Sequence, residues 1–295
     1  MNTTSLSTCI KEFSKKNAAE LSTQFTLLTL LLTQVGIAYT RPFILSLAAI
    51  GLLSSRLCKH PLLWFSLFLL TGFRVFDQWP MADNHAYLLA LWCLTFFLTS
   101  YRESSTRILA NNARILIGLV FLLASFQKIS AADYMNGTFF RYLFLTDDRF
   151  EDFAVLFGNI SYQQIDDARK LLDAYLFSPT LFHGEIVPIS VEFNLLVMLA
   201  TWWNVLDQII VACCFLSPTN SLLYKHRDFV LLVFCITTYA VAPVPGFAWL
   251  LISMALAQSE PKSHIQISYF ITFFIVLFYY QIHWTTLLVD FFQLG

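Results

Sequence analysis

Charged residues are scarce in this chain of 295 residues: Lys, Arg, Asp and Glu make up 13% of it, against 57% hydrophobic residues. A soluble domain is about one quarter charged, so the composition argues against an ordinary soluble enzyme. The formal net charge of −1 lacks the basic excess of nucleic-acid-binding domains, and we expect no nucleic-acid partner. A mean hydropathy of +0.64 is typical of a chain with several membrane spans.

Sequence motifs for metal, nucleotide and hydrolase chemistry are also missing. The chain contains no HExxH, GxSxG or P-loop pattern. Its six cysteines lie almost entirely in or beside apolar segments and form no CxxC pair. We therefore interpret them as small hydrophobic residues and expect no metal site.

The apolar segments lack the alternation of polar and apolar residues, over about ten residues, that marks an outer-membrane barrel. Thirty Phe, twelve Tyr and seven Trp instead fit a bundle of helices with aromatic interfaces. The expected fold class is all-α, a polytopic helical membrane protein with about nine transmembrane helices.

The start of the chain lacks a signal peptide. Residues 1–20 contain five charged side chains and no continuous apolar core. We expect residues 1–21 to form an amphipathic cytoplasmic segment on the membrane surface. Residues 22–295 form the single transmembrane domain.

Apolar stretches long enough to cross a bilayer set the number of spans. They lie near residues 22–40, 42–55, 61–76, 84–100, 113–132, 193–216, 228–243, 246–258 and 266–284. The segments 42–55 and 246–258 are short for a full crossing, so tilted, re-entrant and half-helix arrangements stay open for them. The sequence therefore predicts seven to nine spans.

Basic residues set the expected orientation. With nine spans and a cytoplasmic N-terminus, the inner loops contain most of the Lys and Arg, while the short outer loops contain only Arg41 and Arg74. The acidic connection 133–188 then becomes an outer loop, helical near 165–176, whose aromatic residues are expected to dock onto the bundle. We expect a multi-pass cell-membrane protein, in the inner membrane if the source is bacterial.

Lys128 closes the apolar helical run that begins at Ile115. The 19 residues from Arg114 to Asp133 span about 28 Å as a helix, so the lysine lies roughly 7 Å inside the outer edge of the hydrocarbon. A lysine at this depth either reaches the headgroups with its stem in lipid or has a function inside the protein.

The connection between the third and fourth predicted spans brings further polar groups to the same depth. Asp83 or Asn84 is a good N-cap for the fourth helix, and His85 follows directly. His85 is then either an interfacial residue or an imidazole that moves protons at the mouth of the bundle. Arg74 and Asp77 precede this segment and join the expected polar network.

Asp207 is the deepest acidic residue, in the middle of the predicted span 193–216, one turn after Asn204. A carboxyl group there either fixes helix contacts through hydrogen bonds or belongs to the site. The predicted outer-face pocket thus contains Lys128 and His85 as catalytic candidates, with Asn84, Asp207, Arg74 and Asp77 as its polar network.

Several of these stretches, in this order, resemble one known family. The segment Asp83-Asn-His-Ala-Tyr-Leu88 is similar to the Asn-His-x-Tyr-Leu segment of the HTTM (horizontally transferred transmembrane) family, related to vitamin K-dependent gamma-carboxylases. Phe126-Gln-Lys128 followed by Asp133-Tyr-Met-Asn-Gly137 resembles its lysine at the end of a span, followed by an acid, an aromatic residue and a glycine. Val205-Leu-Asp207 resembles its later acidic span.

The resemblance implies a chemistry for the site. Lys128 would match the lysine that deprotonates the quinol form of vitamin K, whose oxygenation yields a base strong enough to deprotonate a glutamate side chain. His85 would match the assisting histidine. Cys235 stands where the family often has a histidine, and the chain ends at Gly295 without the soluble domain that binds the protein substrate. We therefore expect a lipid- or quinone-sized cavity rather than carboxylation of a protein.

Two functions stay open from the sequence. The first is proton-transfer chemistry on a lipophilic quinol-type substrate, with a quinone or quinol as the only cofactor class implied. The second is a non-catalytic maturation, immunity or export factor that acts through partners such as a secreted peptide. Transport is disfavoured, because the inner half of the spans offers almost no ionisable path.

Overall fold

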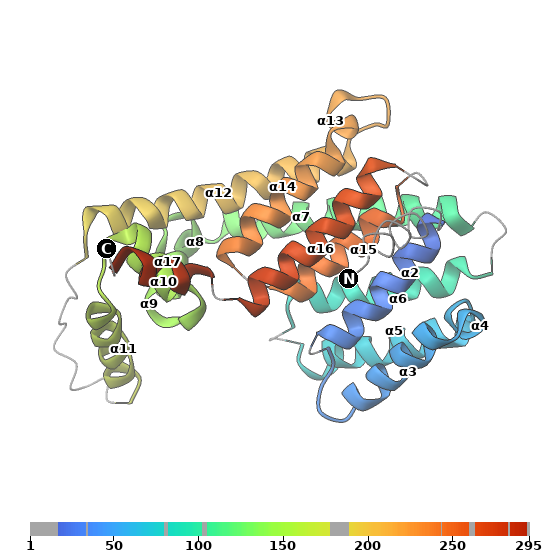
Figure 1. Cartoon of the computed structure of the whole chain (residues 1–295), viewed down its shortest axis with the longest axis horizontal. Coiled ribbons are helices and arrows are strands. Elements are labelled where there is room, and N and C mark those ends of the chain that lie inside the picture. The colour runs from blue at the N-terminus through green and yellow to red at the C-terminus, as the bar shows by residue number, and fades with distance from the viewer. Residues whose placement is uncertain are drawn as a thin grey trace, which may run out of the picture.

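The computed structural model describes residues 17–33, 35–79, 82–101, 105–177, 189–242, 244–259, 263–282 and 284–293. Every regular element in these ranges is a helix, which confirms the all-α class (Figure 1). Residues 1–16 of the expected amphipathic segment lie outside the described ranges. Residues 18–21 belong to the first described helix, α2 (Ala18–Leu32).

All nine apolar segments contain a helix. After α2 these are α3 (Arg41–Leu53), α5 (Pro61–Asp77), α6 (Asn84–Thr99), α7 (Ser105–Ser130), α12 (Val191–Leu216), α14 (Arg227–Val241), α15 (Pro245–Leu256) and α16 (His264–Gln281). Two short helices, α4 (Ser55–Cys58) and α13 (Leu222–Lys225), lie between them.

Three of the described helices are long and apolar enough to cross a membrane: Thr106–Ser130 of α7, then α12 and α16. They support a membrane-embedded protein, and the larger number of crossings stays a prediction. The first segment is shorter than expected, since α2 ends at Leu32 rather than near residue 40. The helix ends because Thr33, its C-cap residue, adopts an extended backbone conformation (φ −110°, ψ 156°).

The short segment near 246–258 is the centre of the core. All residues of α15 from Phe247 to Leu256 are buried, and the helix packs against α2, α7 and α16. A helix that is apolar on every side is stable only when protein or lipid surrounds it completely. Its surroundings in this molecule are other helices.

The two longest helices, α7 and α12, lie against each other along the long axis of the molecule (Figure 1). Gly118 of α7 allows this close approach, because a Cβ atom there would come within 2.6 Å of the Leu216 side chain. This pairing aligns the end of α7 that contains Lys128 with the middle of α12.

The connection 133–188 consists, as far as it is described, of four helices: α8 (Ala132–Met135), α9 (Thr138–Thr146), α10 (Asp148–Gly158) and α11 (Tyr162–Phe177). The helix expected near 165–176 is thereby confirmed. Phe144 and Phe150 dock onto Phe193 of α12 in a second core cluster, as predicted, whereas Tyr142 is exposed. The C-terminal helix α17 (Trp284–Gln293) lies against α10.

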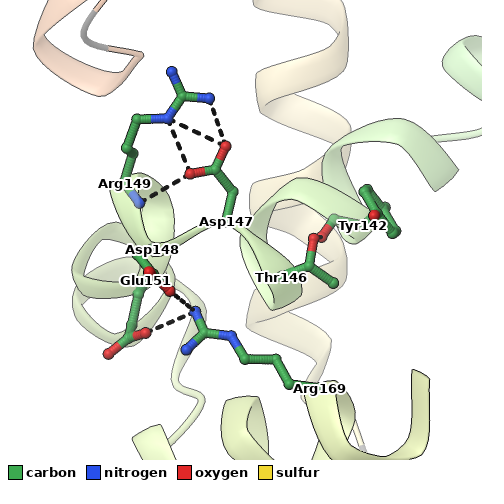
Figure 2. A network of polar contacts seen from close by, with 7 residues as sticks. All are labelled: Tyr142, Thr146, Asp147, Asp148, Arg149, Glu151 and Arg169. Atoms are coloured by element: carbon green, nitrogen blue, oxygen red, sulfur yellow. Dashed lines mark hydrogen bonds and ion pairs between the residues drawn. The ribbon is translucent and has the colours of Figure 1, made fainter. Parts of the chain in front are cut away.

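Ion pairs tie these short helices together (Figure 2). At the start of α10, the Arg149 side chain donates three hydrogen bonds to the Asp147 carboxylate, the shortest 2.6 Å long. These bonds lower the pKa of the Asp147 carboxyl group. Arg169 of α11 reaches Asp148 and Glu151 of α10 at 2.9 and 2.7 Å. The described part of the connection, α8 to α11, therefore forms a helical layer at the Lys128 end of the bundle, which we call the outer helical layer.

Candidate functional site

Lys128 is turned toward the protein. It lies in the last turn of α7, and its Nζ donates a 2.6 Å hydrogen bond to Oε1 of Gln208 on α12. The ammonium group also lies 5.5 Å from the centre of the Tyr134 ring, within the range of a cation–π contact. In this geometry the amine contacts protein groups and is not extended toward the headgroups.

Two amide side chains of α12 continue the hydrogen bonding that begins at Lys128. Asn204 precedes Gln208 by one turn, so the two side chains share a face of the helix. The Asn204 Oδ1 atom accepts from the Tyr134 hydroxyl at 2.6 Å and from Gln208 Nε2 at 3.4 Å. Burial raises the pKa of the Tyr134 phenol, and the nearby Asp207 carboxylate raises it further, so the hydroxyl stays a donor.

His85 and Asn84 approach the same place from α6. Asp83 caps this helix as predicted, since its Oδ1 atom accepts from the backbone N–H of Ala86 at 2.9 Å. Asn84 Nδ2 donates to Gln127 Oε1 at 3.4 Å, which joins α6 to the turn of α7 that contains Lys128. The His85 ring lies on the Phe247 ring of α15, with centroids 4.1 Å apart.

Lys128 and His85 line one cavity. Its volume is about 130 Å³, and its walls come from α6, α7, α12 and α15. The residues that line it are Asn84, His85, Val120, Phe121, Ala124, Gln127, Lys128, Gln208 and Phe247. An amine, an imidazole and three amides therefore face a small space with two phenyl rings in its wall.

A second cavity of about 290 Å³ adjoins the first, and His85 and Phe247 line both. Arg74, Asp83 and Arg149 supply its charged lining. The Arg74 Nη2 atom lies 3.9 Å from Asp83, whose other oxygen lies 3.7 Å from His85 Nδ1. The His85 and Phe247 rings, tilted by 31° to each other, thus face both spaces.

Asp207 and Asp77 do not line either cavity. Asp207 is buried and accepts a 3.0 Å hydrogen bond from Thr238 of α14, which supports the reading in which it fixes helix contacts. Its second oxygen, Oδ1, is buried and has no hydrogen-bond partner among the described residues. Asp77 is exposed at the end of α5. Of the six predicted residues, Lys128, His85 and Asn84 meet in one cavity, and Arg74 lies in the adjoining one.

The sequence reasoning missed three members of the site: Gln208, Tyr134 and Phe247. The four-residue spacing of Asn204 and Gln208 was a usable signal, because it places two amides on one face of an apolar helix. The family resemblance included Tyr134 only as the aromatic residue after Asp133, and no local pattern pointed to Phe247, which reaches the site through the fold.

In the described part of the chain, no three His, Cys, Asp or Glu side chains gather in one place. The comparisons add no relative: no family model, no curated protein and no solved structure matches this chain.

Proposed function

We propose that this protein binds a lipophilic molecule of quinol type between α6, α7, α12 and α15, and that Lys128 and His85 move a proton to or from it. The finer membrane arrangement belongs to the same proposal: seven to nine spans, a cytoplasmic N-terminus and the site near the outer face. A relationship to the HTTM family is part of the proposal and is supported by the resemblance of the motifs around His85, Lys128 and Asp207.

The shared cavity is the observation that supports the proposal most strongly. A lysine and a histidine that face one small space between apolar helices are costly to bury and have defined partners. Phe121 and Phe247 offer ring faces in the wall. Joined to the adjoining space, the cavity reaches the few hundred Å³ that small-molecule sites usually have.

The lining residues fit a ring that bears a hydroxyl group. Such a molecule would supply an acidic O–H and an oxygen acceptor. Lys128 Nζ would give or accept the proton, and Gln208 would hold the amine in place through its 2.6 Å hydrogen bond. His85 would relay the proton toward the adjoining cavity, where Asp83 lies 3.7 Å from its Nδ1 atom.

Ligand binding by the purified full-length protein tests the proposal. We expect a naphthoquinol to bind the wild type in lipid nanodiscs, and Lys128→Ala to weaken its affinity by about tenfold or more, as expected when a hydrogen bond to a charged group is lost. Lys128→Arg should retain binding but lose proton exchange, since guanidinium does not deprotonate near neutral pH.

Lys170→Ala is the matched control, because that lysine is on the exposed helix α11 and pairs only with acids of the same helix. Absence of naphthoquinol binding by the wild type, or equal affinity of the wild type, Lys128→Ala and Lys170→Ala, would contradict the proposal.

The outer helical layer supports a second candidate, a factor that acts through a protein partner. The end of α11 exposes Tyr175, Leu176 and Phe177 next to an acidic helix face. If this surface recognises a secreted peptide, Leu176→Asp should abolish the biological role while quinol binding stays unchanged. If the Leu176→Asp variant kept the biological role, this second candidate function would be excluded.

A further inference from the structure

A cavity of about 510 Å³ lies at the opposite end of α7 from Lys128. Its walls come from the first turns of α7, the turn after α12, helices α13 and α14, and the end of α15. The residues that line it are Arg107, Ile108, Ala110, Asn111, Arg114, Thr219, Tyr224, Arg227 and Gln258. Three guanidinium groups thus face one space, and none of the described lining residues is acidic.

The sequence places this charge on one helix face. Arg107, Asn111 and Arg114 are four and three residues apart, which brings them to the same side of α7. Arg227 comes from the start of α14, across the cavity. Two helices, α7 and α14, therefore bring the three guanidinium groups together, and the cluster is not a run of basic residues along the sequence.

Tyr224 holds two of the guanidinium groups. The Arg227 Cζ atom lies 3.9 Å from the centre of the Tyr224 ring, and the Arg114 Cζ atom lies 5.6 Å from it. Cation–π contacts of this kind fix the planes of the guanidinium groups and restrict their rotation. Both guanidinium groups are thus positioned by protein contacts.

The three arginines have few partners within the described part of the chain. Arg114 donates only to neutral oxygens, Ser217 O at 3.3 Å and Asn111 Oδ1 at 3.4 Å. Arg227 donates to the Tyr224 backbone oxygen at 3.5 Å and forms an ion pair with Asp228 Oδ2 at 3.6 Å, while Asp228 Oδ1 accepts from Tyr269 at 2.9 Å. Its Nε atom is buried and has no hydrogen-bond partner among the described residues. Guanidinium groups arranged in this way leave donors open for an anion.

Phosphate is the anion that this arrangement suits. Planar guanidinium groups bind phosphate oxygens with paired N–H donors, and several of them together balance its charge. The space is also of the size of a headgroup rather than a bare ion. Leu222, Leu223 and Phe229, next to the cavity in sequence, are half or more exposed and offer an apolar surface where acyl chains would lie.

We propose that this cavity binds a phosphate group, supplied by an anionic phospholipid at the membrane surface. The site is independent of the Lys128 cavity, since the two share no lining residue. Basic pockets between spans on the cytoplasmic side are known to hold lipid headgroups, and this end of the bundle is the one that the charge distribution assigns to the cytoplasm.

Native mass spectrometry of the full-length protein, released from detergent after incubation with lipid, tests the proposal. We expect wild-type protein to retain phosphatidylglycerol and not phosphatidylcholine. The double variant Arg107→Gln/Arg114→Gln should retain about tenfold less phosphatidylglycerol or still less, in line with the loss of charge-assisted hydrogen bonds. It leaves Arg227 intact, so the contacts with Asp228 are preserved.

Arg56→Gln is the matched control, because Arg56 is exposed on α4 and does not line the cavity. A second arm measures thermal stabilisation by inorganic phosphate without lipid. Lipid retention that depends on the arginines supports the headgroup, and stabilisation by phosphate alone that depends on them supports the same site with a soluble ligand. If neither signal differs between the double variant and Arg56→Gln, the proposal is overturned.

Discussion

At the scale of single residues, the hydrogen bond between Lys128 and Gln208 decides how the site is interpreted. A lysine near the edge of a membrane usually extends its amine to water. Here the amine instead has a short bond to an amide and lies beside an aromatic ring. A defined acceptor for a partly buried cation indicates that the side chain has one position.

Gln208→Met should therefore destabilise the protein by about 1–2 kcal/mol, because the amine loses its acceptor while its surroundings stay apolar. Unfolding in SDS, followed by circular dichroism, measures the change. Gln281→Met, at an exposed position at the end of α16, is the control. Equal stability of the two variants would show that the bond contributes nothing.

Gly137 is a second residue with a specific requirement. It has φ +83° just before α9, and a Cβ atom there would come within 2.7 Å of Val197 Cγ1. Gly137→Ala should cost about 1–2 kcal/mol from the left-handed conformation alone. Gly72→Ala, where an added Cβ atom meets nothing within 4 Å, should change thermal stability by much less. A Gly137→Ala protein as stable as Gly72→Ala would refute this reading of the turn.

At the scale of elements, charge pairs and caps add to the second core cluster in holding the outer helical layer. Asp147 accepts from Arg149 through both the side chain and the backbone N–H, and so caps α10. These bonds lower the pKa of Asp147 in the folded state. Its stabilising effect is therefore complete above the ordinary value of about 4 and is lost as the pH falls through the lowered pKa.

Thermal unfolding between pH 6 and pH 2 should thus show a loss of stability in the wild type that is smaller in Asp147→Asn. The difference should stay below about 1 kcal/mol, because the Arg149 guanidinium is about half exposed and screened by solvent. Asp173→Asn removes an exposed carboxylate from α11 and serves as the control. Identical pH profiles of wild type and Asp147→Asn would contradict the role of this pair.

Individual elements also show how far the sequence could lead. Runs of apolar residues correctly indicated where nine helices of the bundle lie, because a segment made of apolar residues is buried in the core or in lipid. Local sequence patterns also predicted the N-cap at Asp83 and the helix near 165–176, and the structure contains both. The end of α2 at Leu32 was not predicted, since it depends on the extended backbone of its C-cap residue, Thr33, which no local pattern indicated.

The sequence predicted the members of the site only where the depth of a residue along its span determines where its side chain lies. Counting turns placed Lys128 and His85 at one level, and they line one cavity. Depth does not determine which way a side chain turns around its helix. For this reason Asp207 was expected at the site, whereas the next residue, Gln208, lines the cavity and Asp207 faces α14.

At the scale of the whole molecule, polar side chains gather at the two ends of an apolar bundle. The cavity with Lys128 and His85 lies at one end of α7, beneath the helical layer α8–α11, and the arginine-lined cavity lies at the other. The fully buried helix α15 separates the two, with Phe247 at one end and Gln258 following the other. Two independent ligand sites are the arrangement that this distribution supports.

The central claim is that Lys128 and His85 act on one ligand in one cavity. A double-mutant cycle of His85→Ala and Lys128→Ala, with naphthoquinol affinity measured in nanodiscs, tests it most directly. We predict that each variant weakens binding and that the two losses are not additive, with a coupling energy of about 0.5–3 kcal/mol. Additive losses, or no loss in either single variant while both remain folded, would contradict the account.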